Sequence, residues 1–183
     1  ISDCLVGSEM CIRDSSIQAK LGASNAVAFD LTAACSGFLF ALITASQFLK
    51  GGNFKRAVVI GADQLSSFVD WNDRRSCILF GDGAGALAIE ATNEFDNFIG
   101  FDMRTDGERG SFLNLPFKND RDSIIDNIDF LRGGFSPIQM NGQEVYKFAV
   151  KEVPIILKKL FNETNYSSDE VDWLVLHQAN QRI

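Results

Sequence analysis

The chain has 183 residues, enough for one domain or for two half-sized ones. Hydrophobic residues make up 46% and charged residues 22%, which is the balance of a globular protein, and 17 basic against 24 acidic side chains give a net charge of −7. This acidity disfavours non-specific binding to nucleic acid or to a membrane surface, and no apolar run reaches the roughly 18 residues that span a bilayer.

Cysteine usage argues against a disulfide framework and against a metal centre. The four cysteines, Cys4, Cys11, Cys35 and Cys77, are irregularly spaced, and a single histidine is present to complete any set of metal ligands. We therefore expect no metal and a reduced, intracellular setting.

The first half of the chain predicts a strand, a helix and a second strand. Residues 1–15 show no helix or strand period and predict a non-native or irregular leader, and one or two helical turns follow at 16–21. Short apolar runs at 28–31 and 57–60 predict strands, and the intervening helix, 35–50, is apolar almost all round and ends at a Gly-Gly pair. A buried helix between two strands predicts a βαβ unit and hence a parallel sheet.

Cys35 stands at the N-terminal end of this predicted helix. Unpaired backbone N–H groups and about half a positive charge gather at such an end. A thiolate is stabilised there, so we expect the thiol pKa to fall and the sulfur to act as a nucleophile that carries an acyl group. The alternative is a buried structural cysteine that packs as a small hydrophobe.

A glycine-rich segment, 81–85, follows the predicted polar loop 63–76. Such turns cradle phosphate when they open a helix. Here the apolar run 86–90 comes next, which favours a tight, packed hairpin over a phosphate site. Residues 92–137 are rich in loop signals and predict a surface excursion or a joint between two halves.

Asn141 predicts the cap of a long helix, which Pro154 should kink. Lys147, Lys151 and Lys158 fall within a narrow arc of this helix. They form either an ordinary solvated face or a docking face for an acidic partner.

A last strand is predicted at 172–176, and His177, the only histidine, stands at its C-terminal end. Ligands and catalysis favour the carboxyl ends of strands in α/β sheets, so His177 is a candidate catalytic residue. A satisfied structural histidine is the alternative. Because no covering helix follows this strand before Ile183, we expect the chain to be a fragment of a longer protein.

Four segments taken together closely resemble β-ketoacyl-acyl-carrier-protein synthase III, the condensing enzyme that starts type II fatty acid synthesis: AFDLTAACSGF, DWNDRRSCILFGDGAGA, QMNGQEVYKFAV and DWLVLHQANQRI. The resemblance implies an α/β, thiolase-like fold of two halves layered α-β-α-β-α, incomplete in this chain. Residues 16–95 would then be the remainder of the N-terminal half, with the nucleophile, and 96–183 the beginning of the C-terminal half. It also implies a homodimer in the cytoplasm, or in the plastid stroma of a eukaryote.

The family reaction joins acetyl-CoA to malonyl-acyl carrier protein and gives acetoacetyl-acyl carrier protein, CoA and CO₂, without a cofactor. By resemblance, Cys35 takes the acetyl group, and His177, as a neutral donor, stabilises the oxyanion that forms on decarboxylation. Further residues fall where the family lines its tunnel for CoA and phosphopantetheine-bound substrates: Arg74, Phe80, Met140, Gly142, Tyr146, Ala179 and Asn180. Lys147 and Arg182 resemble its contacts with acyl carrier protein, whose acidity suits a local basic patch.

Two departures from the family pattern matter. Arg75 stands where the family has Gly, and its side chain could narrow or re-charge the CoA entrance. The family's third catalytic residue, an Asn in a GNTSA-type segment, and the Gly-rich turn that completes the acyl oxyanion hole are absent from this chain. We therefore expect the 183-residue chain alone to be inactive.

Three other hypotheses remain open. The first is another thiolase-superfamily acyltransferase, such as a thiolase, a hydroxymethylglutaryl-CoA synthase or a chalcone-synthase-like polyketide synthase; the HQANQRI and MNGQEVYKFAV segments favour synthase III instead. The second is a non-catalytic subunit that dimerises, against which the presence of both Cys35 and His177 argues. The third is a cysteine hydrolase, which lacks an evident orienting carboxylate.

Overall fold

The computed structural model describes residues 13–94, 96–125 and 128–182. Most of the predicted leader therefore lies outside the described residues. Helix α1, Arg13–Lys20, confirms the predicted helical turns at 16–21 and begins three residues earlier.

The sheet that carries the first half of the chain is antiparallel, and the predicted parallel sheet is wrong for the described residues. Strand β1, Arg56–Gln64, pairs along its whole length with β2, Asp82–Glu90, with Arg56 opposite Glu90 and Gln64 opposite Asp82. The apolar run at 28–31 is irregular backbone that joins no described strand. A strand is defined by its hydrogen-bonded neighbour, which the apolar pattern alone does not supply.

The glycine-rich segment 81–85 was predicted to form a tight hairpin, and this prediction is wrong. Most of the segment is the first part of β2. Its residues face the end of β1, with Gly85 opposite Gly61 and Gly83 opposite Asp63. The connection from β1 to β2 is the longer stretch 65–81, which opens with a 3₁₀ turn at Leu65–Phe68. Small residues thus line both strands of this ladder, where a close approach by another element is possible.

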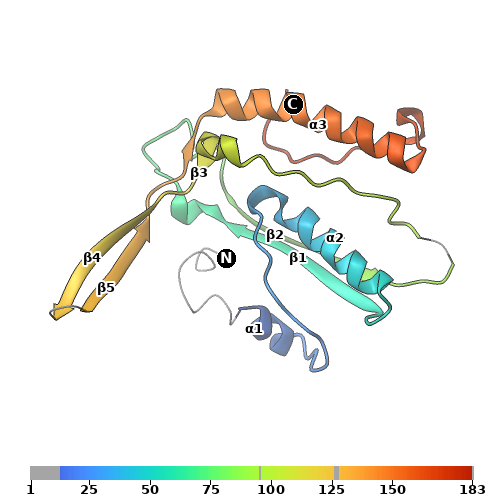
Figure 1. Cartoon of the computed structure of the whole chain (residues 1–183), viewed down its shortest axis with the longest axis horizontal. Coiled ribbons are helices and arrows are strands. Elements are labelled where there is room, and N and C mark those ends of the chain that lie inside the picture. The colour runs from blue at the N-terminus through green and yellow to red at the C-terminus, as the bar shows by residue number, and fades with distance from the viewer. Residues whose placement is uncertain (1–12, 95, 126–127, 183) are drawn as a thin grey trace.

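Helix α2, Gly37–Lys50, lies against the β1–β2 ladder (Figure 1) and ends at Gly51, as predicted. It is buried on one side only, through Ile43, Ser46 and Leu49, whereas Leu39 and Phe48 are largely exposed. The prediction of a helix buried nearly all round is therefore wrong for this chain. Phe48 meets the rings of Phe29 and Phe54 edge-on, with centroids 6.2 and 5.9 Å away.

The stretch 92–137 is less irregular than predicted. A loop leads to a 3₁₀ turn, Gly107–Phe112, and then β3, Leu113–Asn114, pairs antiparallel with β6, Gln139–Met140. Between them β4, Phe117–Ile125, and β5, Ile128–Phe135, form a hairpin that projects from the body of the molecule (Figure 1).

Helix α3, Gly142–Thr164, confirms the predicted long helix and its cap. The Asn141 side chain accepts a hydrogen bond from the backbone N–H of Glu144 over 3.4 Å, and Asn165 ends the helix in the left-handed conformation. The helix continues through Pro154. None of the described helices is long and apolar enough to cross a membrane.

The predicted strand at 172–176 is irregular backbone that pairs with no described strand, so this prediction is also wrong here. Trp173 and Val175 are 86% and 87% exposed, as expected of strand side chains that lack a covering layer. The accessible surface is 14223 Å², against about 8,800 Å² for a compact monomer of this mass. Much apolar surface therefore remains open.

Close packing between α2 and β1 gives a stability prediction at Gly61. A Cβ at this position would lie 3.0 Å from Cδ2 of Phe38, whereas one at Gly85, on the same rung of the ladder, would meet nothing within 4 Å. We expect Gly61→Val to lower the free energy of unfolding by about 1–3 kcal/mol through overpacking. Gly85→Val is the matched control, and equal melting temperatures for the two variants would contradict the prediction.

Candidate active site around Cys35

Cys35 lies in a 3₁₀ turn, Ala34–Ser36, directly before α2. The predicted helix thus begins two residues later than expected, and the sulfur stands on the turn that feeds it. Ala34 has φ +47°, in the left-handed region that residues with a Cβ rarely adopt. Such a conformation persists where the surrounding structure imposes it, and it is a feature of sharp turns that present a functional side chain.

The helix end behind the thiol is free of competing anions. Ser36, the N-cap, makes no side-chain capping bond, and the first turn of α2 holds no acidic residue. The positive end of the helix is therefore not neutralised from within the helix.

The pKa of Cys35 is nevertheless raised above its ordinary value, which corrects the expectation of a lowered one. The larger cause is desolvation by the protein atoms around an otherwise exposed thiol, and the second is the negative charge of Asp63 near the end of β1. A backbone hydrogen bond at Cys35 acts in the opposite direction. In this state the resting sulfur is mainly a thiol at neutral pH.

An open, mostly apolar cavity of about 1090 Å³ adjoins the cysteine. It is bounded by the stretch leading to Cys35, by β1 along its whole length, and by α2, with Phe38, Asp63 and Phe80 among its lining residues. Among the described residues, Phe80 is the only predicted tunnel residue that lines this cavity with Cys35. Asp63 was missed from the sequence, although a carboxylate just beyond an apolar strand is a signal that could have marked it.

Asp63 gives a test of the electrostatics of the thiol. Its charge disfavours the thiolate, so Asp63→Asn should lower the pKa of Cys35. We expect the pH profile of iodoacetamide alkylation at Cys35 to move to lower pH and the rate at about pH 7.5 to rise. Asp82→Asn, which removes a carboxylate of β2 that is bonded to Ser66, is the control. An unmoved profile for Asp63→Asn would show that burial alone raises the pKa.

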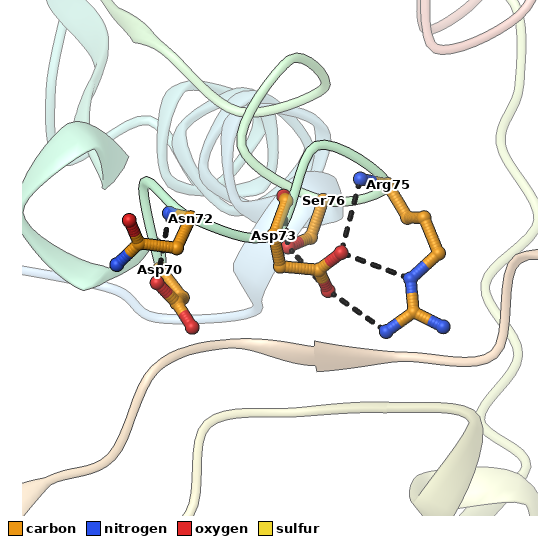
Figure 2. A network of polar contacts seen from close by, with 5 residues as sticks. All are labelled: Asp70, Asn72, Asp73, Arg75 and Ser76. Atoms are coloured by element: carbon orange, nitrogen blue, oxygen red, sulfur yellow. Dashed lines mark hydrogen bonds and ion pairs between the residues drawn. The ribbon is translucent and has the colours of Figure 1, made fainter.

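Arg75, which stands where the family has Gly, is hydrogen-bonded to Asp73 within its own loop (Figure 2). Its Nε and Nη2 donate to the two carboxylate oxygens of Asp73 over 2.9 and 3.3 Å, and its backbone N–H donates to Oδ1 as well. This pairing lowers the pKa of Asp73 and raises that of Arg75. The added positive charge is thus compensated by Asp73, and the neighbouring Arg74 has no ion-pair partner among the described residues.

The second group of predicted residues gathers at the start of α3. Met140 lies in β6, Gly142 opens the helix, and Tyr146 follows one turn later. Tyr146 Oη donates to the backbone carbonyl of Arg182 over 3.2 Å. This bond brings the C-terminal segment with Ala179 and Asn180 back along α3 (Figure 1).

His177 lies in this returning segment. Its side chain is exposed, and it is not among the residues that line the cavity at Cys35. The described residues therefore form two groups, one at Cys35 and one at the start of α3, and no described contact joins His177 to the cysteine. Within the described residues, no three Asp, Glu, His or Cys side chains are grouped as metal ligands.

Comparisons with known proteins identify the relatives of this chain. Residues 29–107 match the family model of 3-oxoacyl-[acyl-carrier-protein (ACP)] synthase III. The chain is 91% identical over 168 residues to beta-ketoacyl-[acyl-carrier-protein] synthase III of Prochlorococcus marinus (strain MIT 9215), and 62% identical over 167 residues to that of Synechococcus sp. (strain WH7803). These matches cover 92% and 91% of this chain but 50% and 49% of the relatives. The chain thus spans about half the length of the curated relatives it matches.

Solved structures agree with this assignment. The crystal structure of 3-oxoacyl-[acyl-carrier-protein] synthase III from Aquifex aeolicus VF5 is 35% identical with a TM-score of 0.76, and covers 92% of this chain and 49% of its own. The crystal structure of beta-ketoacyl-[acyl carrier protein] synthase III from Thermus thermophilus is 30% identical with a TM-score of 0.77. That match covers 92% of this chain and 50% of the Thermus chain. The α/β arrangement described above is therefore that of part of a thiolase-like fold.

Proposed function

We propose that the protein containing this chain is a β-ketoacyl-acyl-carrier-protein synthase III, which condenses acetyl-CoA with malonyl-acyl carrier protein. The products are acetoacetyl-acyl carrier protein, CoA and CO₂, and the reaction initiates fatty acid synthesis. The observation that carries the proposal is the 91% identity to a named synthase III, together with a cysteine that lines an open, mostly apolar cavity.

Cys35 is the proposed nucleophile. The Cys35 thiolate attacks the carbonyl carbon of the acetyl thioester, and the bond to the CoA sulfur breaks. The leaving CoA thiolate takes up the proton that the Cys35 thiol has lost, and the acetyl group remains on Cys35. The unneutralised N-terminus of α2 favours negative charge at the sulfur, while burial and Asp63 oppose it. The mostly apolar lining of the cavity suits the hydrocarbon part of a short acyl group.

His177 is the proposed donor for the second half of the reaction. Loss of CO₂ from the malonyl group puts negative charge on the thioester oxygen, and an imidazole N–H stabilises that oxyanion. The resulting carbanion attacks the acetyl carbon, the thioester bond to Cys35 breaks, and the cysteine sulfur leaves as a thiolate. We propose that His177 approaches Cys35 in the complete protein, as this step requires.

The contacts that we propose with substrate and carrier protein also follow the resemblance to the family. We assign Arg74, Phe80, Met140, Gly142, Tyr146, Ala179 and Asn180 to the passage for CoA and pantetheine, and Lys147 and Arg182 to carrier-protein docking. Arg74 remains available for a phosphate, because Asp73 pairs with Arg75 instead. We further propose that residues 16–95 and 96–183 belong to the two halves of the fold, and that the enzyme is a cytoplasmic homodimer.

A two-stage experiment on the complete protein tests the function. Incubation with acetyl-CoA should add one acetyl group, found by mass spectrometry on the peptide that contains Cys35, and subsequent malonyl-acyl carrier protein should remove it as acetoacetyl-acyl carrier protein. An absence of acetyl adduct would favour a non-catalytic subunit. Adduct without transfer to the carrier protein would favour another acyltransferase of the superfamily.

A further inference from the structure

The backbone of Arg182 is held at both of its polar groups. Asn180 Oδ1 accepts a hydrogen bond from its N–H over 3.0 Å, which closes a local turn. Tyr146 Oη donates to its carbonyl oxygen over 3.2 Å, across 36 residues of sequence. In the described part of the chain this is the one hydrogen bond that ties the segment 172–182 to another element.

The two residues beside this bond carry positive charge. Lys147 directly follows Tyr146 on α3, and its side chain is 66% exposed while it pairs with Glu144 over 2.6 Å. Arg182 is exposed, and no carboxylate of the described residues lies within ion-pair distance of its guanidinium. The tyrosine hydroxyl therefore keeps Arg182 next to the turn of α3 that carries Lys147, although the two cations come from distant parts of the sequence.

We propose that Tyr146 is a positioning residue whose hydroxyl fixes Arg182 beside Lys147, so that both present one cationic surface to an acidic carrier protein. The inference rests on the proposed function, which supplies that partner. It assigns to the hydroxyl a role distinct from that of the aromatic ring, which is the part of Tyr146 that would contact pantetheine. Glu144 is the acidic group that pairs with Lys147 on this surface and tempers its charge.

Tyr146→Phe in the complete protein separates the hydroxyl from the ring. We expect the KM for malonyl-acyl carrier protein to rise about 2- to 10-fold, the worth of one net hydrogen bond, with a smaller change in kcat. The KM for malonyl-pantetheine, which presents the same malonyl group without a protein, should change less. The difference between wild type and variant should shrink as salt increases, because screening weakens exposed charges.

Tyr166→Phe is the matched control, since this second tyrosine is 44% exposed and its hydroxyl has no hydrogen-bond partner among the described residues. An equal KM rise for malonyl-pantetheine and for the carrier-protein substrate would overturn the proposal, because the hydroxyl would then act on the passage itself. Unchanged kinetics with the carrier protein would overturn it too. Failure of the proposed function shows differently: the wild-type protein would form neither acetyl-Cys35 nor acetoacetyl product.

Discussion

Replacement of Cys35 by serine in the complete protein should abolish acetyl transfer, with a loss of at least about 10³-fold in rate. The serine hydroxyl is nearly isosteric with the thiol but is far less acidic. It stands where burial and Asp63 already oppose a negative charge. The N-terminus of α2 alone would not ionise it. Condensation measured with radiolabelled acetyl-CoA, and the mass of the peptide that contains position 35, would report the loss.

Cys77→Ser is the matched control for this substitution. Cys77 is a free, buried thiol that takes no part in the proposed chemistry. That variant should still acquire one acetyl group at Cys35, even if burial of a hydroxyl lowers its melting temperature. An acetyl group found on Cys77, or acetylation of the Cys35→Ser variant at the rate of the native protein, would place the nucleophile elsewhere.

The elements that could be predicted from the sequence are those whose signals are local. Helix α3 was predicted by a cap at Asn141, and α2 by an apolar run and a Gly-Gly stop, because these features act within a few residues. The strand partners could not be predicted in this way. Residues 28–31 and 172–176 have the composition of strands, yet within the described residues neither meets a partner.

The hairpin formed by β4 and β5 shows a different limit. Its sequence is rich in Asp, Asn and Arg, which favour loops. It carries no alternating apolar pattern that would predict a pair of strands. At Phe117, the first residue of β4, the aromatic ring packs edge-on against Phe135, the last residue of β5, with ring centroids 5.0 Å apart. An interaction between residues so distant in sequence leaves no local signal.

At the site, the position of a residue in its helix could be predicted from the sequence, whereas its surroundings in the folded chain could not. Cys35, the proposed nucleophile, was predicted to stand at the N-terminal end of a helix, and it does lie directly before α2. The raised pKa of Cys35 could not be predicted from the sequence. The surrounding atoms and Asp63, which raise it, come close to the thiol only through tertiary packing. The bond between Tyr146 and Arg182 likewise depends on how the C-terminal segment returns along α3.

His177→Ala should separate the two halves of the reaction. We expect condensation to fall about 10²- to 10³-fold, the usual cost of one lost donor to an oxyanion, while acetylation of Cys35 continues. The reason is that His177 is assigned to the decarboxylation of the malonyl group, whereas the first acyl transfer depends on the sulfur and the helix end behind it. Release of radiolabelled CO₂ from malonyl-acyl carrier protein and the mass of the Cys35 peptide measure the two halves independently.

His177→Asn sharpens the test, because an amide keeps a hydrogen-bond donor but cannot act as a base at neutral pH. If His177 serves as an oxyanion donor, the Asn variant should recover part of the CO₂ release that the Ala variant loses. If it serves as a general base for Cys35, both variants should lose acetylation to the same extent. The second outcome would contradict the assignment of His177 to decarboxylation alone and would make it the base that activates Cys35.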